Sequence, residues 1–166
     1  MTARYACRFI ADRLSVSLVE VSTGESERTV RVETGAGPGW EIVLPIWYLP
    51  SVAVLPGPII AVWSVSRLFL LVEGKQPVRA DLDDEIHAVY VVGRRLCIVC
   101  ELAVLIYDPE NASVVDRYVA EDVLGESWWE GNRLLVGSYS GPPLVFTPTA
   151  SGVGLVQRNP ESTPGS

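Results

Sequence analysis

Three glycines mark a unit that recurs at nearly constant spacing along the chain. Gly57, Gly93 and Gly131 are separated by 36 and 38 residues, and each lies in a short turn between two apolar runs. Apolar residues come in short bursts bounded by turn residues, and almost nowhere do they recur at helical spacing for three turns. Such bursts are typical of short β-strands. The chain is therefore predicted to be all-β and built from repeated strand–turn–strand pairs.

A second type of hairpin follows these pairs. Its clearest copy is Leu105–Val119, which turns through residues 108–113. Looser copies lie at residues 19–30, 71–78 and 145–156, each with Gly or Pro in its turn. Asp108 is predicted to form its turn by hydrogen bonding to nearby backbone, as aspartate commonly does. The first unit is the weakest, because residues 5–10 have no clear partner hairpin before Leu14.

The hairpin I106-Y-D-P-E-N-A-S-V114 resembles the outer hairpin of β-propeller repeats of the WD-repeat or quinoprotein-like kind, which often reads apolar-Tyr-Asp-Pro-x-Thr-Gly-x-Val. Looser matches are V21-S-T-G-E25 and F146-T-P-T-A-S-G-V153, and the resemblance covers most of residues 5–157. It implies a propeller-like array of about four short antiparallel blades, since a blade needs four strands in about 40 residues. A β-sandwich or barrel is the alternative.

The length and polarity of the chain set its expected domain organisation. We expect a single all-β repeat domain over residues 1–157, because 166 residues suit one core. Runs such as 59–63 and 96–100 are almost continuously apolar, as in strands buried on both faces. Blades of this kind need neighbours, so an incomplete ring could close with a second copy as a homo-oligomer. The polar, proline-rich residues 158–166 are expected to be a disordered tail.

The charge balance argues against nucleic acid as a ligand. The chain has 20 acidic and 13 basic residues, a net charge of −7, and its arginines are scattered. Such a field repels a phosphate backbone. Three cysteines do not make a disulfide framework, which predicts a reducing, cytoplasmic location. Four charges within residues 1–13 leave no room for the apolar centre of a signal peptide.

Residues 42–66 carry no charge and exceed the roughly 20 residues that a membrane-spanning helix needs. Pro45, Pro50, Pro56 and Pro58 interrupt this segment. Each proline would destabilise a helix interior by about 3 kcal/mol. The segment is therefore predicted to form short buried strands separated by proline turns, without membrane contact.

Cys97 and Cys100 have the spacing of half a zinc site. A zinc site needs about four ligands, and the chain offers no second pair, only the distant Cys7 and one histidine. Residues three apart on a strand also point to opposite faces. Both are therefore interpreted as buried structural cysteines, and we expect neither a metal nor a cofactor.

The segment 81–87 gathers Asp81, Asp83, Asp84 and the only histidine, His87. Its oxygens could hold a divalent cation, but the segment lacks the spacing of a calcium loop. We interpret it as a solvated acidic loop that can face a basic partner.

The segment E126-S-W-W-E-G-N132 is the most unusual local feature. Trp128 and Trp129 are adjacent, so on a strand they point to opposite faces, one expected in the core and the other exposed. Exposed tryptophan beside Glu126 and Glu130 suits a protein-binding hot spot or stacking on a sugar ring. The sequence therefore predicts a non-catalytic binding module, whose acidic loops bind a protein with a basic patch. The alternative is a carbohydrate-binding protein, or a glycoside or ester hydrolase with a carboxylate-lined pocket.

Overall fold

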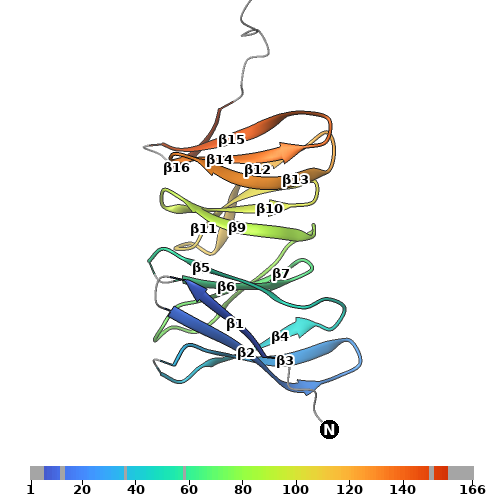
Figure 1. Cartoon of the computed structure of the whole chain (residues 1–166), viewed down its shortest axis with the longest axis vertical. Helices are drawn as coiled ribbons and strands as arrows, with labels where there is room; N and C mark the ends of the chain where they lie inside the picture. The colour runs from blue at the N-terminus through green and yellow to red at the C-terminus, as the bar shows by residue number, and fades with distance from the viewer. Residues whose placement is uncertain (1–5, 12–13, 36, 58, 150–151, 157–166) are drawn as a thin grey trace, which may run out of the picture. The chain divides into compact units, whose positions relative to one another are not determined.

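The structure is a computed structural model that describes residues 6–11, 14–35, 37–57, 59–149 and 152–156. These residues form sixteen β-strands and no helix (Figure 1). The first sheet contains β1 Ala6–Ala11, β2 Leu14–Thr23, β3 Glu27–Glu33 and β4 Trp40–Pro45; the second contains β5 Ser51–Leu55, β6 Ile59–Ser64, β7 Arg67–Leu71 and β8 Val78–Asp81. The third contains β9 Ile86–Val92, β10 Arg95–Cys100, β11 Ala103–Asp108 and β12 Ser113–Val119; the fourth contains β13 Leu124–Glu130, β14 Arg133–Ser138, β15 Gly141–Thr149 and β16 Gly152–Val156.

Each sheet is a meander in which four consecutive strands lie side by side in chain order. Neighbouring strands are antiparallel, as in the pairs β2–β3, β6–β7, β10–β11 and β14–β15. This is the arrangement of a propeller blade. The predictions of an all-β chain and of four propeller-like units are confirmed.

The turn glycines behave as their spacing predicts. Gly57, Gly93 and Gly131 each connect the first two strands of a sheet, with φ values of 91°, 61° and 62°. Positive φ strains any residue that carries a Cβ, so glycine is the natural choice in these turns. The spacing of 36 and 38 residues is therefore the spacing of equivalent turns in successive sheets.

Backbone hydrogen bonds also repeat between sheets. In two of the sheets, the turn between the second and third strands accepts bonds from the chain that leaves the fourth strand. The bonds are Leu82 N to Ser66 O and Ile86 N to Val65 O, then Ala120 N to Leu102 O and Leu124 N to Glu101 O, each 2.8 Å long. Donors and acceptors recur 36 to 38 residues later, so the repeat extends to individual hydrogen bonds.

The chain divides into two compact units, residues 1–86 and residues 87–166. In the first unit, β3 alternates between exposed and buried residues, and its buried side joins the core shared by the first and second sheets. The members of this core are Val16, Leu18, Val30, Val32, Ile42, Leu44, Ile60, Val62, Phe69 and Leu71.

In the second unit, the third and fourth sheets share a core of their own. Its buried members are Val92, Cys97, Val99, Val104, Ile106, Leu124, Leu134, Val136 and Phe146. Strands β10 and β11 are buried along almost their whole length, on both faces. The nearly continuous apolar runs are thus confirmed as strands buried on both sides.

Two predictions about the first sheet are wrong. Residues 19–30 form the hairpin β2–β3, in the middle of the sheet, and are not equivalent to the outer hairpin β11–β12. The first strand of this sheet also does not lack a partner, because Ala6–Ala11 pairs antiparallel with residues 14–19 of β2. Hairpins of similar composition join both the middle and the outer strands, so composition alone misplaced this one by a strand.

The uncharged segment 42–66 forms strands, as predicted. Pro45 ends β4, Pro50 directly precedes β5, and Pro56 lies in the turn after β5. The described part of the chain includes no helix long and apolar enough to cross a membrane. Residues 158–166, the predicted tail, lie outside the described residues, and the single domain over residues 1–157 stays a prediction.

Candidate functional site

The adjacent tryptophans lie on opposite faces of β13. Trp128 is the cross-strand partner of Leu135, and Trp129 is that of Leu134. Both indoles are exposed, by 41% and 44% respectively. The expectation that one of them belongs to the core is therefore wrong: β13 is an edge strand of its sheet, with a hydrogen-bonded neighbour on one side only.

Trp129 is held in place by the third sheet. Its ring meets the Tyr90 ring of β9 edge-on, with centroids 5.9 Å apart and an interplanar angle of 88°. The Tyr90 hydroxyl shares a 2.6 Å hydrogen bond with Ser127 Oγ, one residue before the tryptophans. An edge-on aromatic pair and a hydrogen bond restrict the orientation of β13 and its side chains. The two tryptophans are thus presented on a fixed strand.

Trp128 lies over the one residue of β14 that has no side chain. A Cβ on Gly137 would come within 3.4 Å of Trp128 Cζ3 and 3.1 Å of the Glu126 carbonyl oxygen. The absence of a side chain at Gly137 therefore gives the indole room to lie against the sheet. Trp128 nevertheless remains 41% exposed.

Two exposed carboxylates border Trp128 along the strand. Glu126 lies in the irregular part of β13 before Ser127, and Glu130 ends the strand opposite Arg133. Four residues of extended strand separate the two Cα atoms by about 13 Å. The two carboxylates therefore border Trp128 on either side along the strand.

The acidic segment 81–87 is less free than its sequence indicates. Asp81 accepts hydrogen bonds from Arg79 Nε at 2.8 Å and from Arg67 Nε at 3.2 Å. The Arg79 guanidinium, followed by that of Arg67, holds the pKa of Asp81 below its usual value. Asp84 Oδ1 accepts a 2.8 Å bond from the next backbone N–H. Part of the negative charge of this segment is therefore already compensated within the fold.

The predicted site residues fall in both compact units. Asp81, Asp83 and Asp84 belong to residues 1–86, whereas the exposed His87 opens the second unit, which also holds residues 126–130. The structure brings Glu126, Trp128, Trp129 and Glu130 together on one strand. Trp129 lies on the opposite face of the strand from Trp128, so we call Glu126, Trp128 and Glu130 the β13 surface.

Asp108 forms its turn as predicted, and with more partners than the turn alone requires. Its buried carboxylate accepts bonds from Glu110 N at 2.9 Å and from Asn111 Nδ2 at 2.7 Å, and it also pairs with the Arg95 guanidinium. Arg95 is the main reason that the pKa of Asp108 is lowered. This carboxylate stabilises the β11–β12 turn and has no proton to donate near neutral pH.

The two cysteines of β10 are buried, as predicted. Burial raises the pKa of the Cys97 thiol to about 12, so at neutral pH this thiol is protonated and is not a nucleophile. Among the described residues, no group of three or more His, Cys, Asp or Glu side chains could hold a metal ion.

A second exposed aromatic segment was not predicted from the sequence. Trp47, Tyr48 and Leu49 lie between β4 and β5 and are exposed by 71%, 58% and 64%. The sequence does carry a signal that these residues form a loop. Prolines at 45 and 50 bracket them, and proline disfavours the interior of a strand. The segment was instead interpreted as part of an apolar, buried run.

Comparison with known proteins supports the fold and leaves the activity open. No protein-family model and no curated protein matches the chain. The crystal structure of HIRA(644-1017) superposes with a TM-score of 0.54 at 13% sequence identity. The match covers 91% of this chain and 54% of that one, so the chain spans about half the length of HIRA(644-1017). This likeness concerns architecture alone, and with the four meanders it shows that the chain has an all-β, propeller-like fold.

Proposed function

We propose that this chain is a non-catalytic binding module, of the WD-repeat or quinoprotein-like propeller kind, that binds another protein through the β13 surface. The observation that carries the proposal is the exposed Trp128 on a strand fixed by Tyr90, with Glu126 and Glu130 on either side. Tryptophan is the residue type most enriched among binding hot spots. A fixed indole also loses little conformational freedom on binding.

The exposed part of Trp128 supplies a useful amount of binding energy. A large aromatic side chain buries up to about 250 Å², so covering the exposed 41% removes roughly 100 Å² from water. At about 25 cal/mol per Å², this corresponds to about 2.5 kcal/mol. One side chain of this kind changes a dissociation constant by more than tenfold.

Charge would select and orient the partner. The chain carries a net charge of −7, and Glu126 and Glu130 are exposed beside the indole. A partner with a basic patch would be attracted and aligned by this field, mainly through a faster association rate. The loop at Asp83 and Asp84 adds negative charge in the first unit, with the cytoplasm as the proposed setting.

Binding to a purified partner tests the proposal. Proteins retained by the immobilised chain would be identified by mass spectrometry, purified, and titrated by calorimetry against wild type and Trp128→Ala. We expect Trp128→Ala to weaken binding at least tenfold, and the matched variant Val115→Ala, half-exposed on β12, to bind like wild type. Equal affinities for wild type and Trp128→Ala would refute the assignment of the site.

The enzyme alternative has a different signature. If hydrolysis of a glycoside or ester were found and Glu126→Gln, Glu130→Gln or His87→Ala abolished turnover while binding survived, the chain would be a hydrolase. Oligosaccharide binding that requires Trp128, without a protein partner, would instead identify a carbohydrate-binding protein.

A further inference from the structure

Three consecutive large apolar side chains are exposed in the first unit. Residues 46–50 connect β4 to β5, and within them Trp47, Tyr48 and Leu49 are each more than half exposed. Soluble proteins expose single apolar side chains routinely, but contiguous ones usually mark an interaction site. We call residues 46–50 the apolar loop.

The backbone of the apolar loop is fixed by hydrogen bonds from buried side chains. The carbonyl oxygen of Tyr48 accepts hydrogen bonds from the guanidinium of Arg28, on β3, and from Ser64 Oγ at 3.4 Å, on β6. Arg28 and Ser64 are both buried, and so is Pro50, which ends the loop. The loop is therefore held by two sheets of the same unit at its centre. A segment anchored in this way presents its side chains without a large ordering cost on binding.

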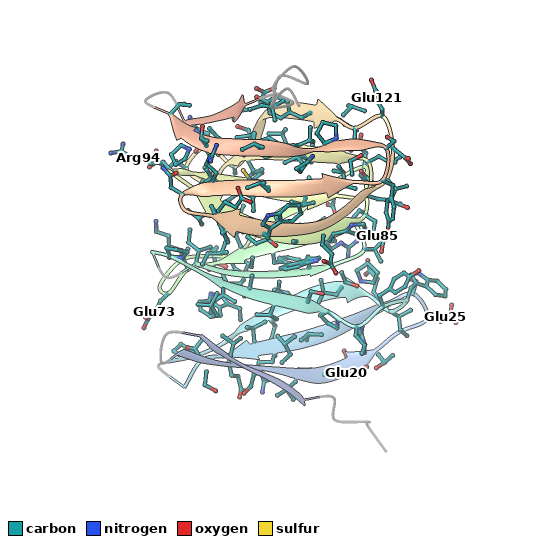
Figure 2. The ribbon with its side chains drawn as sticks, turned by 45° about the horizontal axis from the view of Figure 1, so that its top comes forward. Glu20, Glu25, Glu73, Glu85, Arg94 and Glu121 are labelled. Atoms are coloured by element: carbon teal, nitrogen blue, oxygen red, sulfur yellow. The ribbon has the colours of Figure 1, made fainter. Side chains whose placement is uncertain are left out.

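Acidic residues border the loop. Ile46 N donates a 3.1 Å hydrogen bond to Ser26 O, which places the loop against the β2–β3 turn that carries Glu25 and against Glu27, the first residue of β3. Glu27 pairs with Arg67 at 3.0 Å. Glu25 is exposed, makes no ion pair within the described part of the chain, and lies at the outer edge of the ribbon (Figure 2).

We propose that the apolar loop is a second docking surface, and that its occupant is a protein with an apolar cleft bordered by basic side chains. Trp47 and Leu49 would enter the cleft, and Glu25 would face its basic border. Charge complementarity favours this occupant over two others. A second copy of the chain and an anionic bilayer are both negative, and they would meet Glu25 and a net charge of −7 with repulsion.

Photo-crosslinking identifies the occupant directly. Tyr48→p-benzoylphenylalanine keeps an aromatic side chain and leaves the anchored carbonyl oxygen intact. The variant would be irradiated in lysate of the native cells, and crosslinked proteins identified by mass spectrometry, purified, and titrated by calorimetry. We expect Trp47→Ala and Leu49→Ala each to weaken binding about tenfold or more, and Glu25→Gln to weaken it a few-fold with reduced salt dependence.

The controls separate this site from the β13 surface. All three substituted side chains are exposed, so the variants should keep the wild-type melting temperature. Trp128→Ala should bind the crosslinked protein like wild type, while Trp47→Ala should keep the affinity of any partner of the β13 surface. Failure of one site thus leaves the other testable.

Several outcomes would overturn the proposal. One is a crosslink only to a second copy of the chain, with concentration-dependent dimerisation in sedimentation that Trp47→Ala abolishes. Another is Trp47-dependent binding to phosphatidylcholine vesicles containing phosphatidylserine. Equal affinity of the crosslinked protein for wild type and Trp47→Ala, or no crosslink dependent on residue 48, would also refute it.

Discussion

Replacement of Phe146 by alanine tests whether the third and fourth sheets share one core. Phe146 is fully buried on β15, opposite Leu134 and Leu155. Its ring meets Tyr118 of β12 edge-on, with centroids 5.4 Å apart and planes at 69°. Core Phe→Ala substitutions lower the free energy of unfolding by about 3–5 kcal/mol, of which an edge-on ring pair supplies about 0.5–1.5 kcal/mol.

The free energy of unfolding of a typical domain is about 5–15 kcal/mol, so this loss is a large fraction of it. Urea denaturation should show it as a lower midpoint, whereas Val115→Ala, half-exposed on β12, should change the stability by less than about 0.5 kcal/mol. Hydrogen exchange followed by mass spectrometry should show β10–β11 and β14–β15 losing protection together. Loss of protection in the fourth sheet alone, or a change below about 1 kcal/mol, would refute the shared core.

In a Cys7→Ser background, the native protein should resist labelling by iodoacetamide at about pH 8, because burial raises the pKa of the Cys97 thiol to about 12. If the native chain were labelled as fast as the urea-unfolded chain, that burial would be contradicted. Asp108→Asn should reduce acid sensitivity. The pKa of Asp108 is held below its usual 3.8, so its ionised form stabilises the fold above that pH and the stabilisation disappears as pH falls through the folded pKa. Urea midpoints of the two proteins should therefore converge in acid, and a constant difference would disprove the linkage. Gly131→Ala should lower stability by about 1–2 kcal/mol through backbone strain alone, because φ is 62° and nothing lies within 4 Å of the added Cβ; an unchanged melting curve would exclude the left-handed turn.

Much of the fold could be predicted because its signals are local. A glycine that must adopt positive φ and a short apolar run on either side specify a strand–turn–strand pair wherever they occur, and Gly57, Gly93 and Gly131 did so correctly. The position of a hairpin within its sheet depends on pairing with distant strands. The hairpin at residues 19–30 was therefore misplaced, since its own residues do not report that β1 precedes it.

The residue types of the candidate site could be predicted from the sequence, but the exposure of its side chains could not. Alternation along a strand correctly separates Trp128 from Trp129. Their exposure depends on what the neighbouring strand and sheet supply, namely Gly137 beneath one indole and Tyr90 beside the other. The Arg95–Asp108 pair was missed for the same reason. Arg95 begins β10 and Asp108 ends β11, and only the pairing of these two strands brings them together.

The salt dependence of partner binding distinguishes the two proposed contributions to binding, orientation by acidic residues and buried area from Trp128. The dissociation constant of the purified complex would be measured for wild type and for Glu126→Gln/Glu130→Gln between about 50 mM and 500 mM salt, a range over which exposed charges become screened. We predict that wild-type affinity falls several-fold across this range, and that the affinity of the double variant starts weaker and falls less. A wild-type affinity independent of salt, or the same salt dependence in both proteins, would contradict the account.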